Sequence, residues 1–305
     1  MSADRILLVE NPAELTLDTG RLRIRRDGKP DAFVAPPDVA VLVLHHHAIH
    51  ISHGALQTLA EAGAAVMVTD RLHLPGGLLL PWQANRAAPS RLRRQIEHLD
   101  ASLPAVLWQS LVVGRIRTQA AVLHRFGCKG ALRLERMVAE VGPGDATHRE
   151  GQAARHYWQH LFEDFKREKQ GAQDPVNSRL NYGYAALRAL VAREVVAAGL
   201  SPELGLGHRS QENPFNLADD FMEPYRFLVE ARVKTLLDSG PEQIEAPLAG
   251  KAKQDVLRFM EGEIVMDNGN GYRVGAAVRE TVASYVRILE GGKGGLILPT
   301  GEAWD

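Results

Sequence analysis

One cysteine, Cys128, is the only thiol in the 305 residues. An internal disulfide framework is therefore excluded, and the composition fits a reducing cytoplasm. Long hydrophobic runs are also missing, and the longest, such as residues 39–44, are far too short to span a bilayer. No basic stretch followed by an apolar one opens the chain, because Asp4, Arg5 and Glu10 interrupt it. These absences predict a soluble cytoplasmic protein.

The chain has almost no excess charge of either sign. Lysine and arginine number 36 against 37 aspartates and glutamates, a net charge of −1 that argues weakly against nucleic-acid binding. The distribution is uneven, however. Between Arg86 and Arg136, nine arginines and one lysine face three acidic residues, an excess of seven positive charges. A local basic patch of this kind suits a phosphate backbone, and the alternative is a solvated helix face.

The first eighty residues are predicted to be mostly β structure. Short runs rich in Val, Ile and Leu alternate with turn signals such as Asp27-Gly28, which is typical of a hairpin. One helix is expected over residues 52–62. The predicted strands are residues 6–9, 14–17, 22–25, 32–34, 39–44 and 64–69.

From about Ser90 the hydrophobic period changes to 3.6, which predicts helices up to about Leu289. Asp174-Pro175 is a helix start, and Gly199 is the matching stop. The fold class is therefore α+β: a β-rich domain over residues 1–81, a linker over 82–89 and a larger helical domain over 90–305.

Glu150 stands at the start of a predicted helix whose packed face carries Ala153, Ala154, Tyr157 and Leu161. Two interpretations are open for this glutamate. In the stretch Thr147 to Glu150 it fits a capping box, in which the Glu side chain returns to the N-cap amide. The small alanines one turn on would instead let another element approach, which favours a functional site.

His208 follows a glycine-rich stretch, Gly205-Leu206-Gly207, and precedes Asn213-Pro214. A lone loop histidine is usually just exposed to solvent. Here the glycines permit close backbone approach, and the loop leads directly into an acidic helix.

That helix opens at Asn216, a candidate N-cap, and carries Asp219, Asp220 and Glu223. Acidic residues in a first turn are expected from the helix dipole. Glu223 is harder to dismiss, because Pro224 follows it inside a helical pattern and should kink the helix.

Glu150, His208 and Glu223 together form a candidate metal site. Two carboxylates and one imidazole can hold a hard divalent cation and leave positions for water and a phosphate. Mg²⁺ or Mn²⁺ is the expected cofactor. The other histidine cluster, from His45 to His53, is more simply a solvated edge or a dimer contact, since neighbouring strand residues point to opposite faces.

The chain resembles a known family over nearly its whole length. Four stretches carry the resemblance in the second half: EGQAARHYW, LNYGYAALRA, GLSPELGLGHRSQENPF and LADDFMEPYR. In the first half, VLVLHHHAIHIS and LAEAGAAVMVTDRLHLPGGLLLP carry it. They resemble the CRISPR-associated spacer-acquisition integrases, in the form found beside a single-protein effector nuclease (type II). Two departures, one histidine where relatives often have two and Phe221 for a commoner leucine, touch no expected ligand.

The resemblance implies an N-terminal β-sandwich, a C-terminal helical domain and a homodimer. It also implies assembly with the small adaptation partner of the CRISPR system, with two integrase dimers flanking one partner dimer. The family's metal ligands fall on Glu150, His208 and Glu223. Supporting roles are expected for Asp220, Asn213 and Arg226.

The implied reaction is integration of short DNA, in which a fragment's 3′-hydroxyl attacks a phosphodiester of the CRISPR repeat. With water as the nucleophile the same site is an endonuclease. Arg91, Arg93 and Arg94, where the basic excess is concentrated, are expected along duplex DNA. Two alternatives remain open: a non-catalytic DNA-binding scaffold, and a small-molecule hydrolase, which has no need of an arginine stripe.

Overall fold

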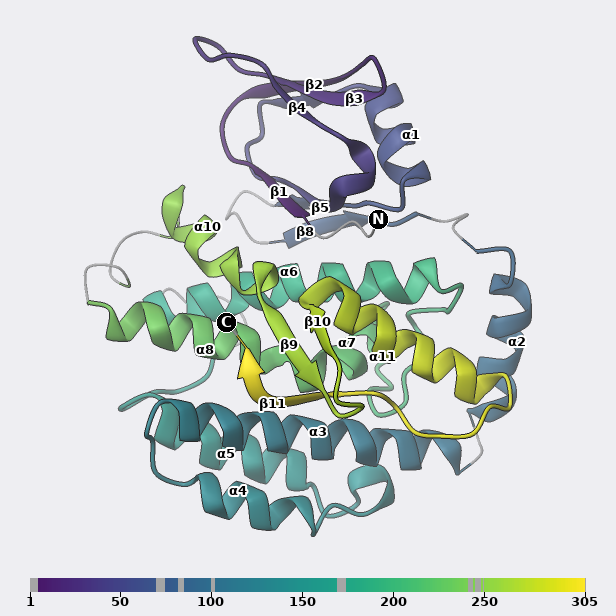
Figure 1. The fold of residues 1–305 in the computed structure, drawn as a ribbon, viewed down its shortest axis with the longest axis vertical. Coiled ribbons are helices and arrows are strands. Elements are labelled where there is room, and N and C mark those ends of the chain that lie inside the picture. Colours follow the sequence, from purple (N-terminus) through teal and green to yellow (C-terminus); the bar gives the residue numbers. More distant parts are fainter. Residues whose placement is uncertain are drawn as a thin grey trace.

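The computed structural model describes residues 5–69, 75–81, 85–99, 102–168, 174–240, 244, 248 and 250–304. A β-rich N-terminal part stands on a larger, mainly helical part (Figure 1). The predicted α+β fold is confirmed. Residues 82–84 of the predicted linker lie outside the described residues.

The N-terminal part contains two four-stranded sheets, with orders β1-β5-β7-β8 and β4-β3-β2-β6. The strands are β1 (Arg5–Val9), β2 (Ala13–Asp18), β3 (Arg21–Arg25), β4 (Ala32–Val34), β5 (Val39–Leu44), β6 (Ile49–Ile51), β7 (Ala65–Thr69) and β8 (Pro75–Leu79), with helices η1 (Pro36–Asp38) and α1 (His53–Glu61). The hairpin turn predicted at Asp27-Gly28 does join the antiparallel pair β3 and β4. Strands β6 and β8 were not predicted from the sequence.

Strand β5 is apolar throughout because both of its faces are buried. Leu42 packs into the core between the two sheets, together with Leu15 and Leu22. Val41 and Val43 point the other way and join the core of the helical part. A strand covered on both faces has a continuous hydrophobic sequence rather than an alternating one.

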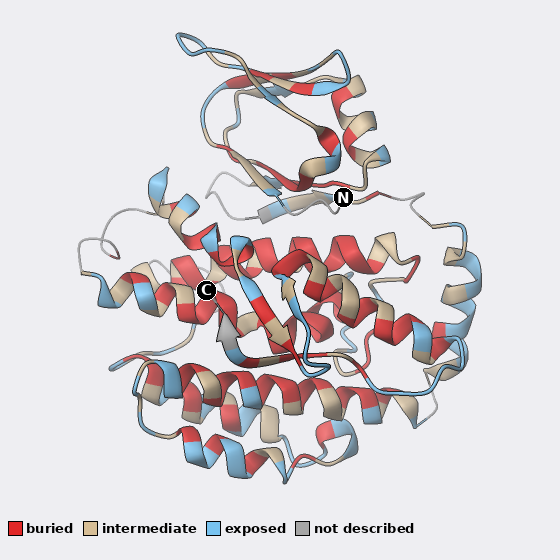
Figure 2. Cartoon of the chain, viewed as in Figure 1, coloured by how far each residue is buried: buried red, intermediate tan, exposed pale blue. Residues whose placement is uncertain are grey.

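The helical part is built around two long helices, α3 (Leu103–Arg125) and α6 (Pro175–Ala197). Much of their length is buried (Figure 2). The surrounding elements are α2 (Ala88–His98), α4 (Ala131–Val138), η2 (Pro143–Asp145), α5 (Arg149–Leu161), α7 (Asn216–Met222), η3 (Glu223–Tyr225), α8 (Arg226–Asp238), α10 (Lys251–Leu257), η4 (Arg258–Glu261) and α11 (Val274–Leu289). None of the described helices is long and apolar enough to cross a membrane.

Local signals set the ends of α6 as predicted. The Asp174 side chain accepts a hydrogen bond from the Asn177 amide at 2.8 Å, Pro175 is the first helical residue, and Gly199 has a φ of +69° just beyond the end. The structure adds a feature that the helical period does not show: a three-stranded sheet of β9 (Glu263–Met266), β10 (Gly271–Arg273) and β11 (Pro299–Trp304), in the order β10-β9-β11.

A buried lysine joins the two parts. Lys253 of α10 is 1% exposed, its Nζ contacts Nε2 of His45 just after β5, and its ammonium lies 5.6 Å from the Tyr182 ring centre. Burial lowers the pKa of Lys253 to about 8, although Glu10 opposes the shift. The buried lysine is therefore costly to keep charged.

This geometry predicts a pH-dependent stability. Below about pH 8 both states carry the Lys253 proton; between pH 8 and the usual lysine pKa of 10.5 the folded protein alone releases it. The free energy of unfolding of the natural protein, relative to Lys253→Met, should therefore rise over this range, by up to about 3 kcal/mol. Urea titrations at pH 7 to 10.5 measure it. The exposed neighbour Lys251 offers the matched control Lys251→Met, which should leave the pH dependence of stability unchanged. If the difference in unfolding free energy between the natural protein and Lys253→Met did not change with pH, the lowered pKa of Lys253 would be contradicted.

Candidate metal centre

Three separate elements bring Glu150, His208 and Glu223 into one region. Glu150 lies in the first turn of α5, His208 in the loop before α7, and Glu223 opens η3. Burial and the Glu223 carboxylate raise the pKa of Glu150, and His208 is close enough to lower it. In the described part of the chain, no three His, Cys, Asp or Glu side chains lie close enough together to hold a metal ion as they stand. Direct convergence of the three on one cation therefore stays a prediction.

Glu150 is not a capping residue. Asp145 supplies the cap of α5, since its two carboxylate oxygens accept the amides of Arg149 and Glu150 at 2.8 and 2.9 Å. The N-cap position is His148, in a left-handed conformation, and not Thr147. The capping-box interpretation is therefore wrong, and the Glu150 carboxylate remains available for another role.

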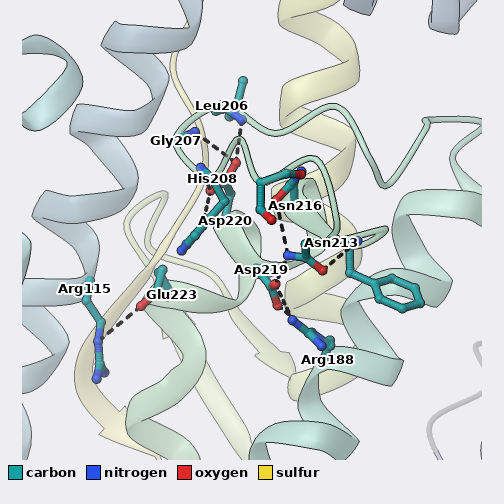
Figure 3. Close-up of polar contacts among 12 residues, drawn as sticks. Arg115, Arg188, Leu206, Gly207, His208, Asn213, Asn216, Asp219, Asp220 and Glu223 are labelled. Atoms are coloured by element: carbon teal, nitrogen blue, oxygen red, sulfur yellow. Dashed lines mark hydrogen bonds and ion pairs between the residues drawn. The ribbon is translucent and has the colours of Figure 1, made fainter. Parts of the chain in front are cut away.

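The loop that carries His208 is held by one buried carboxylate, that of Asp220 (Figure 3). It accepts hydrogen bonds from the amides of Leu206, Gly207 and His208. It also lies 2.6 Å from Nδ1 of the His208 ring. A carboxylate at Nδ1 fixes the tautomer of the ring and leaves Nε2 as the nitrogen with a lone pair, which is the usual arrangement behind a metal-binding histidine. The hydrogen bond to Asp220 raises the pKa of His208, against the effect of burial.

Two glycines make this loop possible. A Cβ on Gly205 would lie 2.1 Å from the carbonyl oxygen of His208, and one on Gly207 would lie 2.2 Å from the Trp108 ring. Neither position has room for any side chain. The glycines of the GLGH stretch are thus explained by close approach, as the sequence suggested.

The other side of the loop is tied to Asp219. Arg188 forms an ion pair with this carboxylate, and Nδ2 of Asn213 donates to it at 2.7 Å (Figure 3). Asn213, predicted as a supporting residue, thus supports the loop rather than a candidate ligand. Asn216, expected to be the N-cap, is instead the first residue of α7, because Phe215 occupies the N-cap position. The Asn216 side chain donates to two loop carbonyls.

Glu223 is 5% exposed and lies between two arginines. Nε of Arg226 is 2.9 Å from Oε1, and Nε of Arg115 is 3.6 Å from Oε2. Pro224 interrupts the helix as predicted. Helix α7 ends at Met222, and the 3₁₀ turn η3 separates it from α8. The turn directs the Glu223 carboxylate toward α3.

Beneath Glu223 lies a buried ion pair that the sequence analysis missed. Arg115 of α3 donates through Nη1 and Nη2 to the two oxygens of Glu230, at 3.0 and 2.5 Å, and the Tyr184 hydroxyl donates to Glu230 at 2.5 Å. Burial alone would lower the pKa of Arg115, but Glu230 outweighs it and raises the pKa. Two features of the sequence could have indicated this pair: a lone arginine on the buried side of an apolar helix, and a glutamate seven residues after Glu223.

The donor set fits a divalent cation. Two carboxylates and an imidazole suit Mn²⁺ or Mg²⁺, and the hydrogen bond from His208 to Asp220 is a second, geometric indication. Arg226, expected in support, does contact Glu223.

The family model described as CRISPR associated protein Cas1 matches residues 6–245. The chain belongs to the Cas1 family. A CRISPR-associated endonuclease Cas1 from Neisseria meningitidis serogroup C (strain 8013) is 37% identical over 283 residues, 92% of this chain and 90% of that protein.

Solved structures share the Cas1 fold at lower identity. A casposase bound to an integration product has a TM-score of 0.80 at 17% identity, covering 96% of this chain and 92% of that one. A Cas6-RT-Cas1–Cas2 complex gives 0.73 at 19%, covering 95% and 35%. A Cas1–DNA complex gives 0.63 at 20%, covering 95% and 93%. At these identities the likeness shows the fold.

Two of the three arginines expected along DNA have structural partners in this Cas1-family chain. Arg91 pairs with Glu290 and donates to the Ala198 carbonyl, and Arg94 donates to the Leu289 carbonyl at 3.0 Å. They attach α2 to the ends of α6 and α11. Arg93 is exposed beside them.

The buried pair predicts a specific pattern of stability. Arg115→Met leaves Glu230 charged and unpaired in the core, and should lower the free energy of unfolding by about 3–5 kcal/mol. The double variant Arg115→Met/Glu230→Gln removes both charges and should recover a large part of that loss. Denaturant titration of the single and double variants measures the difference, and a double variant less stable than Arg115→Met would contradict it.

Proposed function

We propose that this protein is the metal-dependent integrase and endonuclease of CRISPR adaptation, inserting short DNA fragments into the CRISPR repeat. Family membership supports the activity class. The site rests on the hydrogen-bonded Asp220–His208 pair, which lies close to the carboxylates of Glu150 and Glu223.

The reaction is a transesterification at phosphorus. The 3′-hydroxyl of the fragment forms a new P–O bond to a repeat phosphate, and the bond to the departing 3′-oxygen breaks. A bound Mg²⁺ or Mn²⁺ supplies Lewis-acid stabilisation of the phosphate charge. Glu150, Glu223 and Nε2 of His208 would hold it, and Asp220 would keep the proton of His208 on Nδ1.

The proposed partners are those that the family resemblance implies. Duplex DNA with 3′ ends is the substrate, and a small adaptation partner dimer would be flanked by two dimers of this chain. Solved neighbours include a complex with Cas2 and a complex with DNA. Arg93, with Arg91 and Arg94 beside it, is proposed to face duplex phosphates at the outer edge of α2.

The carboxylate at position 223 provides the direct test. Glu223→Gln keeps the shape but removes the charge, and should reduce strand transfer and cleavage of labelled DNA in Mn²⁺ by about a thousandfold or more, because the ligand is lost. Glu212→Gln, at an exposed position of the neighbouring loop, is the control and should be fully active. Near-normal transfer by Glu223→Gln would refute the site. A natural protein that binds DNA but neither transfers nor cleaves would favour the scaffold.

Metal binding should depend on pH. A cation competes with a proton for Nε2 of His208, and Asp220 raises the pKa of this histidine above its usual 6.5. Mn²⁺ affinity should therefore fall with decreasing pH, and the fall should begin at a higher pH than for a histidine without a carboxylate partner. Electron paramagnetic resonance titration from pH 5.5 to 8 measures free Mn²⁺. A Mn²⁺ affinity that does not change across this range would exclude His208 as a ligand.

We further propose that the N-terminal sheets supply the homodimer contact. Edge strand β8 carries Leu79, 40% exposed, so Leu79→Lys should shift the protein toward monomer in light scattering at micromolar concentration. Leu132→Lys on α4, at a residue 65% exposed, is the control and should not change the mass. A dimer unaffected by Leu79→Lys would place the contact elsewhere. Truncating residues 1–80 is a poorer test, because it uncovers the apolar side of α6.

A further inference from the structure

Trp108 lies directly against the loop that carries the candidate ligand His208. Its indole and the His208 ring are 5.5 Å apart between centres and meet edge to face at 75°. A Cβ on Gly207 would stand only 2.2–2.5 Å from three atoms of the same indole. Trp108 is 9% exposed and belongs to the core of the helical part, so it is a fixed surface rather than a mobile cover.

We propose that Trp108 is a positioning residue for His208, which fixes the orientation in which Nε2 meets the cation. The inference rests on the proposed function, in which His208 is a metal ligand. The Asp220 carboxylate restrains Nδ1, but this single hydrogen bond does not by itself fix the plane of the imidazole ring, because the histidine χ2 torsion has broad minima. An edge-to-face contact with a rigid indole removes that freedom.

Helix α3 gives this contact a second consequence. Arg115, which contacts Glu223, lies seven residues after Trp108, so both project from one side of the same helix. At 1.5 Å per residue the two Cα atoms are about 10 Å apart along the helix axis. One rigid helix thus supports two candidate ligands, and the distance between His208 and Glu223 depends on how closely the loop rests on Trp108.

The experiment compares three tryptophan variants. Trp108→Leu removes the flat surface, Trp108→Phe keeps an aromatic face, and Trp158→Leu makes the same change at a half-buried tryptophan that stacks on Phe162. We expect about tenfold weaker Mn²⁺ binding in Trp108→Leu, the loss typical of an outer-shell substitution. Trp108→Phe should bind within about twofold of the natural protein, and Trp158→Leu should be unchanged on the same scale.

A metal-free measurement accompanies the titration. The His208 ring protons, assigned by their loss in His208→Asn, lie in the ring current of Trp108 and should move in the proton NMR spectrum of Trp108→Leu but not of Trp158→Leu. The proposal would be overturned if Trp108→Leu bound Mn²⁺ as tightly as the natural protein, or if Trp158→Leu weakened Mn²⁺ binding as much as Trp108→Leu. If Trp108→Leu does not fold, Trp108→Met replaces it, because methionine keeps more apolar volume but has no flat face: Mn²⁺ binding should again weaken by about tenfold, and unchanged affinity there would also overturn the proposal. Unchanged affinity in His208→Asn would instead refute the metal site itself.

Discussion

Burial of carboxylates is the constraint on which the rest of this site depends. Asp220, Glu223 and Glu230 are all at most 5% exposed, and a charge in such a place is costly unless it is paired and hydrogen-bonded. Each has a different solution: three backbone amides and an imidazole for Asp220, two arginines for Glu223, and one arginine with a tyrosine for Glu230. The surrounding chain is arranged around these partners. The GLGH loop supplies amides to Asp220, and the arginine inside α3 pairs with both Glu223 and Glu230.

The sequence predicted those features that depend on a few neighbouring residues. The apolar runs predicted β5 and β7, and Asp174-Pro175 predicted the start of α6, because a short apolar run and a helix cap are both local features. The sheet formed by β9, β10 and β11 was not predicted. Met266 pairs with Pro299, 33 residues away, and no periodicity in either segment records that pairing. Strand β8 has two glycines in five residues, so its strand character comes from pairing with β7 and not from propensity.

The candidate site shows the same division. Its three candidate ligands were predicted from local contexts and from the family resemblance, and the structure brings them into mutual electrostatic range. Their supports could not be found that way. Asp145 displaced the expected cap because of a left-handed turn at His148, and Arg115 reaches Glu230 across 115 residues of chain. A buried charge on an apolar helix indicates that a partner exists, but not which residue it is. Only the packing of α3 against η3 and α8 identifies it.

Helix α3 shows why a site assembled from distant segments can nevertheless be precise. Gly114 lets η3 approach, since a Cβ there would meet Pro224 at 3.3 Å; Trp108 supports the His208 loop; and Arg115 contacts Glu223. All three lie within two turns of one buried helix, which has few ways to deform. The candidate ligands sit on a loop, a 3₁₀ turn and a first helical turn, which are the more adaptable parts of a fold. Because these segments rest on one rigid helix, the candidate ligands have few ways to move relative to one another.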